Sequence, residues 1–316
     1  MSYDRLKRRL DADEVVILDG ATGTELERRG ARMDTAAWCA PATIENDQLL
    51  TEIHADYIRA GSQVITANTF SSTRMLLKAS GLGDRAPEIS RRAVEAALRA
   101  RDVTHRPEVV VAGSLSHMVP IAKGLTAADP KAVPSDAEIG DSLDELARTL
   151  ASAGCDLIIL EMMYHPVRAR LALKAALSTG LPVWFGASAR RGKAGKAVSF
   201  YRHDDMALGE IAALIPDGVD VAGVMHTEPA VMEEALGVIR GKFDGPLMAY
   251  PDSGYFEMPN WRFVDIIAPG RLEQFFADWL RAGVRVIGGC CGLTPEHIAA
   301  AVRARAAFVG RGTEWE

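Results

Sequence analysis

The sequence predicts a single (β/α)8 barrel, the TIM-barrel class of α/β fold, and three observations support this prediction. Eight short runs of β-branched and aliphatic residues recur along the 316 residues. Apolar residues are consecutive within each run, which is typical of strands covered on both faces in a parallel sheet. Longer segments with helical spacing separate the runs, without a Gly/Ser/Pro-rich linker. The alternative is an open, doubly wound sheet with a second domain. Eight successive strand–helix units favour the barrel instead, as a single domain that spans residues 1–316.

Each element of this barrel has its own signal. The predicted strands are residues 15–19, 64–69, 109–113, 156–161, 183–187, 219–225, 246–250 and 284–289. Helical spacing is clear in Leu49, Ile53 and Tyr57, and again in Leu143, Leu146 and Leu150. Gly61, Gly154 and Gly283 each follow a helical stretch and precede a strand, as helix C-caps do. Two segments rich in Lys, Gly, Ala and Asp, residues 124–137 and 189–205, are predicted to be long loops from a strand to the next helix.

Composition and charge direct attention to small ligands. Hydrophobic residues make up 48% of the chain and charged residues 25%, which is typical of a globular protein. The net charge of −6 argues against nucleic acid or an anionic membrane as a partner. The charged N-terminal 14 residues do not resemble a signal peptide, and no apolar stretch approaches the roughly 18 residues of a membrane span. We therefore expect a cytoplasmic protein with small-molecule partners, and a homo-oligomer remains open.

In such a barrel the loops after the carboxyl ends of the strands form the catalytic face. Residues capable of chemistry follow the predicted strands at these positions. They are Asp19, Gly20, Asn68, Thr69, Ser114, His117, Glu161, Ser188, His226, Tyr250, Cys290 and Cys291.

The strongest local motif is the Gly-Gly-Cys-Cys-Gly stretch of residues 288–292. Its glycines permit a sharp turn that lets both thiols face one point, and Thr294 and Pro295 suit the start of the last helix. Only four cysteines occur in the chain, so a disulfide scaffold is not expected, and an adjacent pair favours metal ligands or reactive thiols. Two small buried residues or a vicinal disulfide are the alternatives.

Two thiolates leave a zinc ion short of its usual tetrahedral set. His226, which ends the sixth predicted strand, is one candidate for the third ligand. Cys39 is its competitor, and Cys155 suits the role less because it precedes a strand.

Together these motifs resemble the homocysteine S-methyltransferase family. The matching segments span nearly the whole chain: residues 19–25 (Asp-Gly-Ala-Thr-Gly-Thr-Glu), 67–70, 112–114, Glu161, 250–254 (Tyr-Pro-Asp-Ser-Gly) and 288–297. The resemblance implies a zinc-dependent enzyme that transfers a methyl group to the thiol of homocysteine and gives methionine.

One departure concerns the third zinc ligand. The family's sixth-strand motif is typically Gly-Val-Asn-Cys, and here Gly223, Val224, Met225 and His226 hold those places. The resemblance thus implies zinc held by His226, Cys290 and Cys291. With a substrate thiolate the site would carry −1 rather than the −2 of a three-cysteine site. A less negative site lowers the pKa of the bound thiol and weakens it as a nucleophile, so we hypothesise an altered acceptor or donor.

The resemblance also suggests how the substrates bind. Asp19 and Glu161 would bind the ammonium group of homocysteine, and backbone amides near Gly20 and Ala21 would bind its carboxylate. Thr69 is a weaker candidate for substrate binding. Asp19 could instead brace the first turn, and Glu161 could pair with an arginine. His117 and Met118 stand where the family more often has Gly-Pro, and no role follows for them.

Trp38 bears on the methyl donor. Betaine-using relatives have a tryptophan in a similar place, and an indole face attracts a quaternary ammonium or sulfonium methyl group. Tyr250 and Tyr255 would add a second aromatic wall. S-methylmethionine, S-adenosylmethionine or betaine is therefore expected, rather than methylfolate, whose users in the family carry further modules. The alternatives are a zinc hydrolase or lyase with water at the open position, and a non-catalytic thiol-binding protein.

Overall fold

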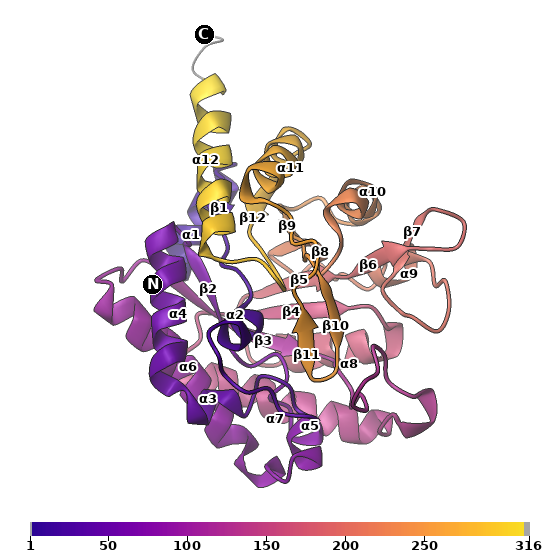
Figure 1. The fold of residues 1–316 in the computed structure, drawn as a ribbon. Helices are drawn as coiled ribbons and strands as arrows, with labels where there is room; N and C mark the ends of the chain where they lie inside the picture. The colour runs from indigo at the N-terminus through magenta and orange to yellow at the C-terminus, as the bar shows by residue number, and fades with distance from the viewer. Residues whose placement is uncertain (1, 313–316) are drawn as a thin grey trace.

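The computed structural model describes residues 2–312 and has an eight-stranded parallel sheet at its centre (Figure 1). Its strands follow the order β1-β12-β9-β8-β5-β4-β3-β2. The two end strands are joined by a parallel bridge between Leu18 and Val64, and the Gln63 amide donates to the Ile17 carbonyl at 2.8 Å. The sheet therefore curves back on itself as a barrel, which confirms the predicted TIM-barrel class.

All eight predicted strands are present. They are β1 (Val16–Ile17), β2 (Val64–Ala67), β3 (Val110–Ser116), β4 (Leu157–Met163), β5 (Val183–Ala187), β8 (Val221–Met225), β9 (Leu247–Tyr250) and β12 (Val284–Ile287). Nearly all their residues are buried, because the interior of the barrel covers one face and the helices cover the other. The register sets Met225 opposite Tyr250 at the carboxyl ends of β8 and β9.

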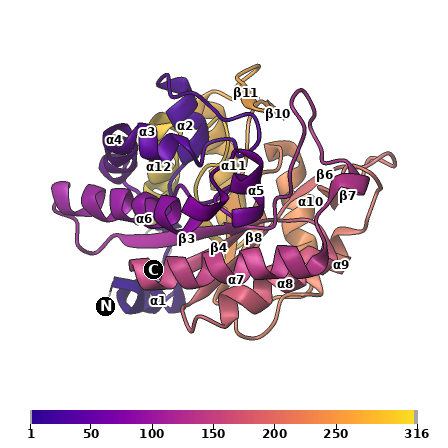
Figure 2. The same cartoon turned by 90° about the horizontal axis from the view of Figure 1, so that it is seen from below.

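Helices surround the sheet and pack in neighbouring pairs such as α4 with α6 and α11 with α12 (Figure 2). The helices are α1 (Ser2–Asp11), α2 (Thr22–Arg28), α3 (Ala42–Glu45), α4 (Asp47–Ala60), α5 (Arg74–Ala79), α6 (Ala86–Val103), α7 (Asp136–Ala153), α8 (Pro166–Leu177), α9 (Leu208–Ala212), α10 (Pro229–Arg240), α11 (Pro269–Arg281) and α12 (Pro295–Gly312), with single turns η1 (Gly83–Arg85) and η2 (Pro130–Ala132). Gly61, Gly154 and Gly283 adopt positive φ at or next to a helix end, as predicted. No helix within residues 2–312 is long and apolar enough to cross a membrane.

Two β-hairpins extend from the barrel. Residues 189–205 do connect a strand to a helix, but they contain the antiparallel pair β6 (Ala189–Arg191) and β7 (Ala197–Ser199), which corrects the prediction of a plain loop. The Glu234 carboxylate on α10 stabilises this hairpin by accepting from the Ala197 amide at 3.0 Å. The second hairpin, β10 (Tyr255–Glu257) with β11 (Asn260–Arg262), was not predicted.

The long connections after β3, β5 and β9 meet at one end of the barrel, because all three follow the carboxyl ends of strands. The segment after β3 touches the second hairpin, where the Gly124 amide donates to the Met258 carbonyl at 2.9 Å and the Met258 amide donates to the Leu125 carbonyl at 3.1 Å. These connections enclose the space above the barrel, where the site residues lie.

Candidate metal centre and active-site cavity

The Gly-Gly-Cys-Cys-Gly loop after β12 is held by backbone hydrogen bonds to its neighbours. The Cys290 amide donates to the Pro251 carbonyl at 2.7 Å, and the Ser253 amide donates to the Cys291 carbonyl at 2.9 Å. Gly292 has φ of +79°, and a Cβ there would lie 2.0 Å from the Ser253 carbonyl oxygen. Only glycine fits this close approach, so the sequence of the loop fixes the position of both thiols.

His226 follows β8 in an uncommon backbone conformation. Its φ is +43°, and its amide donates to the Tyr250 carbonyl at 3.1 Å. The imidazole makes edge contacts with Phe200 and Trp261, at centroid distances of 5.2 and 5.6 Å. Such strained residues cluster at functional sites, and here the two rings hold the imidazole toward the cysteines.

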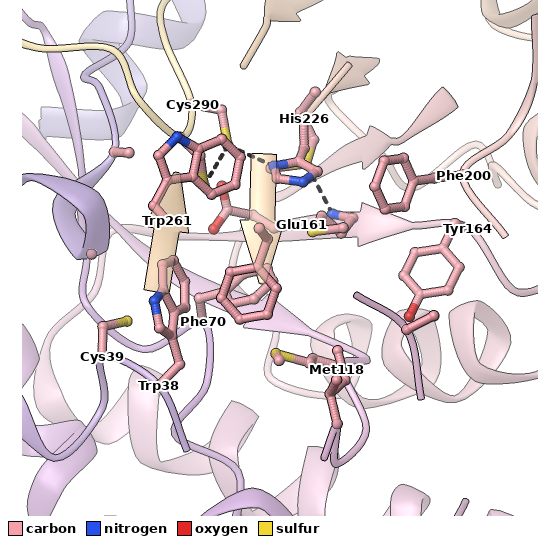
Figure 3. A pocket seen from close by; sticks show the side chains of 18 of the residues that line it. Trp38, Cys39, Phe70, Met118, Glu161, Tyr164, Phe200, His226, Trp261 and Cys290 are labelled. Carbon is pink, nitrogen blue, oxygen red and sulfur yellow. Dashed lines mark hydrogen bonds between the residues drawn. The ribbon is translucent and has the colours of Figure 1, made fainter. Parts of the chain in front are cut away.

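The three predicted metal ligands converge (Figure 3). His226 Nδ1 lies 3.6 Å from Cys290 Sγ, the two Sγ atoms lie 3.9 Å apart, and all three ligand atoms fall within 4.8 Å of one another. A tetrahedral zinc ion with bonds of about 2.3 Å to sulfur and about 2.0 Å to nitrogen requires separations near 3.8 Å between sulfurs and near 3.5 Å between sulfur and nitrogen. The donor set therefore fits zinc in both chemistry and spacing.

Charge around the ligands also suits a cation. Asp252 Oδ2 lies 3.6 Å from His226 Nε2, the position in which a carboxylate commonly orients a metal-bound histidine. A hydrogen bond between the thiols of Cys290 and Cys291, 3.9 Å apart, together with His226 lowers the pKa of Cys290 to about 7. Both neighbours therefore favour the thiolate form of Cys290.

The other two cysteines lie elsewhere. Cys39 Sγ contacts Asn68 Oδ1 at 3.2 Å and Ser71 Oγ at 3.7 Å, beside the cavity but outside the ligand cluster. Cys155 is buried against β3, and a Cβ added to Gly113 of that strand would lie only 3.0 Å from its Sγ. Among the described residues, the cluster of three potential ligands contains His226 rather than either of these cysteines.

Two buried carboxylates flank the metal ligands. Asp19, just after β1, accepts from the Thr66 amide at 2.7 Å and from the Thr66 hydroxyl at 3.0 Å. Glu161 accepts from the Ser114 hydroxyl, and an irregularity in β4 beside Met162, whose φ is +54°, turns this part of the strand. Burial raises the pKa of Glu161 to about 7 and raises that of Asp19 well above its ordinary value. Both carboxylates would be stabilised by a cationic ligand.

Most of the predicted site residues line one cavity of about 290 Å³. These are Asp19, Gly20, Trp38, Glu161, His226, Tyr250, Cys290 and Cys291. Tyr250 is buried and packs against Gly186 of β5. A Cβ at residue 186 would lie 2.7 Å from the Tyr250 hydroxyl, so only glycine leaves room for this side chain.

Two predicted residues lie away from the cavity. Thr69 is not among the lining residues, and its hydroxyl donates to the Ser114 carbonyl at 2.7 Å. Tyr255 is 48% exposed, whereas the next residue, Phe256, lines the cavity. Alternation along β10 explains this difference, because consecutive side chains of a strand point to opposite faces.

An aromatic wall faces the metal ligands (Figure 3). The Trp38 ring makes edge contacts with Phe70 and Phe256, at centroid distances of 5.9 and 5.6 Å. Trp261 adds to the wall from the second hairpin, and Glu27 on α2 positions it by accepting from its amide at 2.9 Å. Sequence reasoning placed Phe70 in the motif after β2 without giving it a role, and it missed Phe200, Phe256 and Trp261.

His117 and Met118, for which the sequence gave no role, lie beside the cavity. Met118 is one of its lining residues. His117 is fully buried, and its Nε2 accepts from the Tyr164 amide at 3.1 Å, so it positions the turn between β4 and α8.

Comparison with known proteins agrees with this site. Residues 16–305 match the model of the family described as homocysteine S-methyltransferase. The chain belongs to the homocysteine S-methyltransferase family. It is 28% identical to Homocysteine S-methyltransferase 4 of Zea mays, over 93% of this chain and 90% of that protein. It is also 28% identical to Homocysteine S-methyltransferase of Escherichia coli (strain K12), over 93% of this chain and 96% of that protein.

A solved structure of the homocysteine methyltransferase MmuM from Escherichia coli, in its metallated form, superposes with a TM-score of 0.73. The two are 26% identical, and the match covers 94% of this chain and 98% of that one. As a family member, this protein is a homocysteine S-methyltransferase-like enzyme with a His/Cys/Cys cluster suited to a metal, zinc being the ion that best fits.

Proposed function

We propose that this enzyme transfers a methyl group from a sulfonium or quaternary ammonium donor to the thiol of homocysteine, and that zinc held by His226, Cys290 and Cys291 is its cofactor. The observation that carries the proposal is the convergence of these three ligand atoms within 4.8 Å, in a cavity that two buried carboxylates and an aromatic wall also line. When bound there, zinc would lower the pKa of the substrate thiol and keep its sulfur ionised at neutral pH.

Asp19 and Glu161 suit the ammonium group of the acceptor. Both carboxylates line the cavity and are buried, and the charge of Glu161 contributes to the raised pKa of Asp19. An ammonium ion between them would relieve the cost of burying both charges. The backbone beside Gly20 and Ala21 lines the same cavity and is the candidate for the acceptor's carboxylate. Glycine allows the chain to pack closely here, because a Cβ on Gly20 would lie 2.7 Å from the Tyr57 hydroxyl.

Trp38 and its neighbours suit the methyl-bearing cation of the donor. Trp38, Phe70, Phe256 and Trp261 all line the cavity, and an aromatic face attracts an onium group by a cation–π interaction. Their apolar surfaces also exclude water, so the cation is held without competing hydration. Tyr250, which also lines the cavity, would be a further contact.

The reaction itself needs no general base in the transfer step. The thiol proton passes to solvent when the acceptor binds as thiolate. A lone pair of the sulfur then attacks the methyl carbon, a new carbon–sulfur bond forms, and the bond from methyl to the donor's sulfur or nitrogen breaks. Its electron pair stays on the departing neutral sulfide or tertiary amine. This enzyme's own residues contribute orientation of both partners and a dry cavity.

The experiment is to incubate the zinc-loaded enzyme with homocysteine and, one at a time, S-methylmethionine, S-adenosylmethionine and betaine, each carrying a deuterated methyl group. Mass spectrometry should detect methionine with that methyl group from at least one donor. A Cys290→Ala variant serves as the control and should give none. Complete absence of labelled methionine from all three donors, with full zinc occupancy, would contradict the proposal.

A further inference from the structure

Arg168 lines the active-site cavity as a buried cation that pairs with no acidic group. The residue lies in the first turn of α8 and is only 5% exposed. Its Nη1 is enclosed without a hydrogen-bond partner, and within the described chain its guanidinium makes no ion pair. The guanidinium carbon of Arg168 lies over the ring of Tyr164, 5.2 Å from the ring centroid. Arginine cannot shed its charge in a protein, so this arrangement is costly unless an anion completes it.

The surroundings of Arg168 add positive potential. A second guanidinium, that of Arg202, lines the same cavity and lies 4.7 Å from the centroid of Phe200, with no hydrogen bond or ion pair among the described residues. Arg168 also lies in the first turn of α8, which has no side-chain N-cap, and the N-terminal end of a helix favours negative charge. Three acidic residues line the cavity: Asp19 and Glu161, which are assigned above to the acceptor's ammonium, and Asp136, an exposed residue at the start of α7.

A chain of ring contacts separates Arg168 from the metal ligands. His226 contacts Phe200 at 5.2 Å, Phe200 contacts Tyr164 at 6.0 Å, and Tyr164 lies under Arg168. The labelled side chains of Figure 3 show His226, Phe200 and Tyr164 in this succession. A ligand that reaches Arg168 therefore passes along aromatic surface between an anion-binding end and the place where the acceptor sulfur is held.

We propose that Arg168, aided by Arg202, binds the carboxylate of the methyl donor, so the donor is a zwitterion with a methyl-bearing onium group and a carboxylate at its far end. This inference rests on the proposed methyl transfer. The proposed function assigns the acceptor's ammonium and carboxylate to Asp19, Gly20 and Glu161. The part of the cavity beside Arg168 is therefore left for the second substrate, the methyl donor. The cation then lies in the cavity between the rings of Phe200 and Tyr164 and the wall that contains Trp38, and the anion meets an arginine that pairs with no carboxylate among the described residues.

The test compares onium compounds that differ in their tails. Isothermal titration calorimetry on the zinc-loaded enzyme, with and without homocysteine, measures binding of glycine betaine against choline and of dimethylsulfoniopropionate against trimethylsulfonium. We expect the carboxylate member of each pair to bind about tenfold tighter or more, as a charged hydrogen bond in a partly desolvated site allows. Arg168→Gln should remove this preference for the carboxylate compound without weakening the binding of choline or trimethylsulfonium. Arg168→Lys should keep part of the preference.

Arg170→Gln is the matched control. It removes the same charge from the same helix at an exposed position outside the cavity, and it should leave the preference intact. Thermal melting of each variant checks that it is folded. Arg202→Gln is a second test substitution, and it should reduce the preference for carboxylate compounds less than Arg168→Gln does. An unchanged preference in Arg168→Gln, an equal loss for both members of a pair, or a loss confined to homocysteine binding would overturn the inference.

These outcomes separate the inference from the proposed function. If the carboxylate preference depends on Arg168 and no donor methylates homocysteine, the anion site stands and methyl transfer fails. If methionine forms and the preference for carboxylate donors survives in Arg168→Gln, methyl transfer stands and the inference fails.

Discussion

His226 Nδ1 and Cys290 Sγ lie 3.6 Å apart, although 64 residues separate them in the sequence. Their strands, β8 and β12, are not neighbours in the barrel, because β9 lies between them. The contact is made by the loops beyond the strand ends, which reach across β9. A metal ion at this point would link two non-adjacent parts of the barrel.

Removing either side of this contact should remove the metal. We expect Cys290→Ala and His226→Ala to retain far less zinc than the wild type, because two ligands hold zinc much more weakly than three. Inductively coupled plasma mass spectrometry of the purified proteins measures this. Cys155→Ala, in a buried cysteine outside the cluster, is the control and should keep its zinc. Full retention in both ligand variants would contradict the site.

Restoring a third thiolate should change reactivity. His226→Cys makes the site more negative by one charge, and the bound acceptor sulfur becomes more basic and more nucleophilic. At saturating donor, this variant should methylate homocysteine faster than the wild type. The hypothesis of a weakened nucleophile fails if the rate does not rise while zinc occupancy is complete.

Glu161 should cost stability at high pH. Burial raises the pKa of its carboxyl from 4.5 to about 7, so the folded state binds a proton that the unfolded state has already released. The free energy of unfolding of the metal-free enzyme should therefore fall as the pH rises from about 4.5 to about 7, by up to about 3 kcal/mol. Glu161→Gln should be more stable than the wild type at about pH 8 and similar at about pH 4 in denaturant titrations. The exposed Glu95→Gln is the control, and an equal pH dependence in wild type and Glu161→Gln would refute this role for burial.

Trp38 should act on the donor rather than on the acceptor. Trp38→Phe keeps an aromatic face and Trp38→Leu removes it, so the KM for the donor should rise modestly in the first and about tenfold in the second. The KM for homocysteine should change little in both variants. Equal increases for both substrates would indicate general damage to the cavity instead of a contact with the donor cation.

Glu27 should hold the second hairpin in place. Its carboxylate accepts from the Trp261 amide at 2.9 Å and from Asn260 Nδ2 at 2.8 Å. In Glu27→Ala the Trp261 amide should exchange its hydrogen faster, and the KM for the donor should rise because one aromatic wall becomes mobile. Glu257→Ala removes a half-buried carboxylate that pairs with Arg262 inside the same hairpin instead of linking the hairpin to α2, and it should alter neither quantity. Unchanged protection of the Trp261 amide in Glu27→Ala would exclude this anchoring role.

The fold could be predicted because its strands are buried on both faces and thus stand out as apolar runs. The hairpins could not, since each strand of β10 and β11 has three residues and only part of one face is covered. The same reason explains the choice of Tyr255 over Phe256. A strand shorter than two periods gives no alternation from which to decide which side chain points inward.

The candidate metal ligands could be expected from the sequence because glycines accompany the two cysteines and because the family resemblance favours the position of His226 over Cys39. Thr69 shows the limit of such reasoning. It follows β2 at the carboxyl end, as the other site residues follow their strands, yet its hydroxyl bonds to the Ser114 carbonyl on the neighbouring strand. Arg168 was missed for the opposite reason. It lies inside a helix among other basic and apolar residues, and only its burial without a partner sets it apart.

The close backbone packing of the cysteine loop has a consequence for the handling of the cofactor. Because Gly292 sits against Ser253 and the Cys290 amide is bonded to Pro251, we expect the two sulfurs to keep their places when the ion is removed. Depletion by a chelator should then be reversible, with the apoprotein remaining folded and regaining its ion on simple readdition, unlike small zinc domains that unfold when stripped.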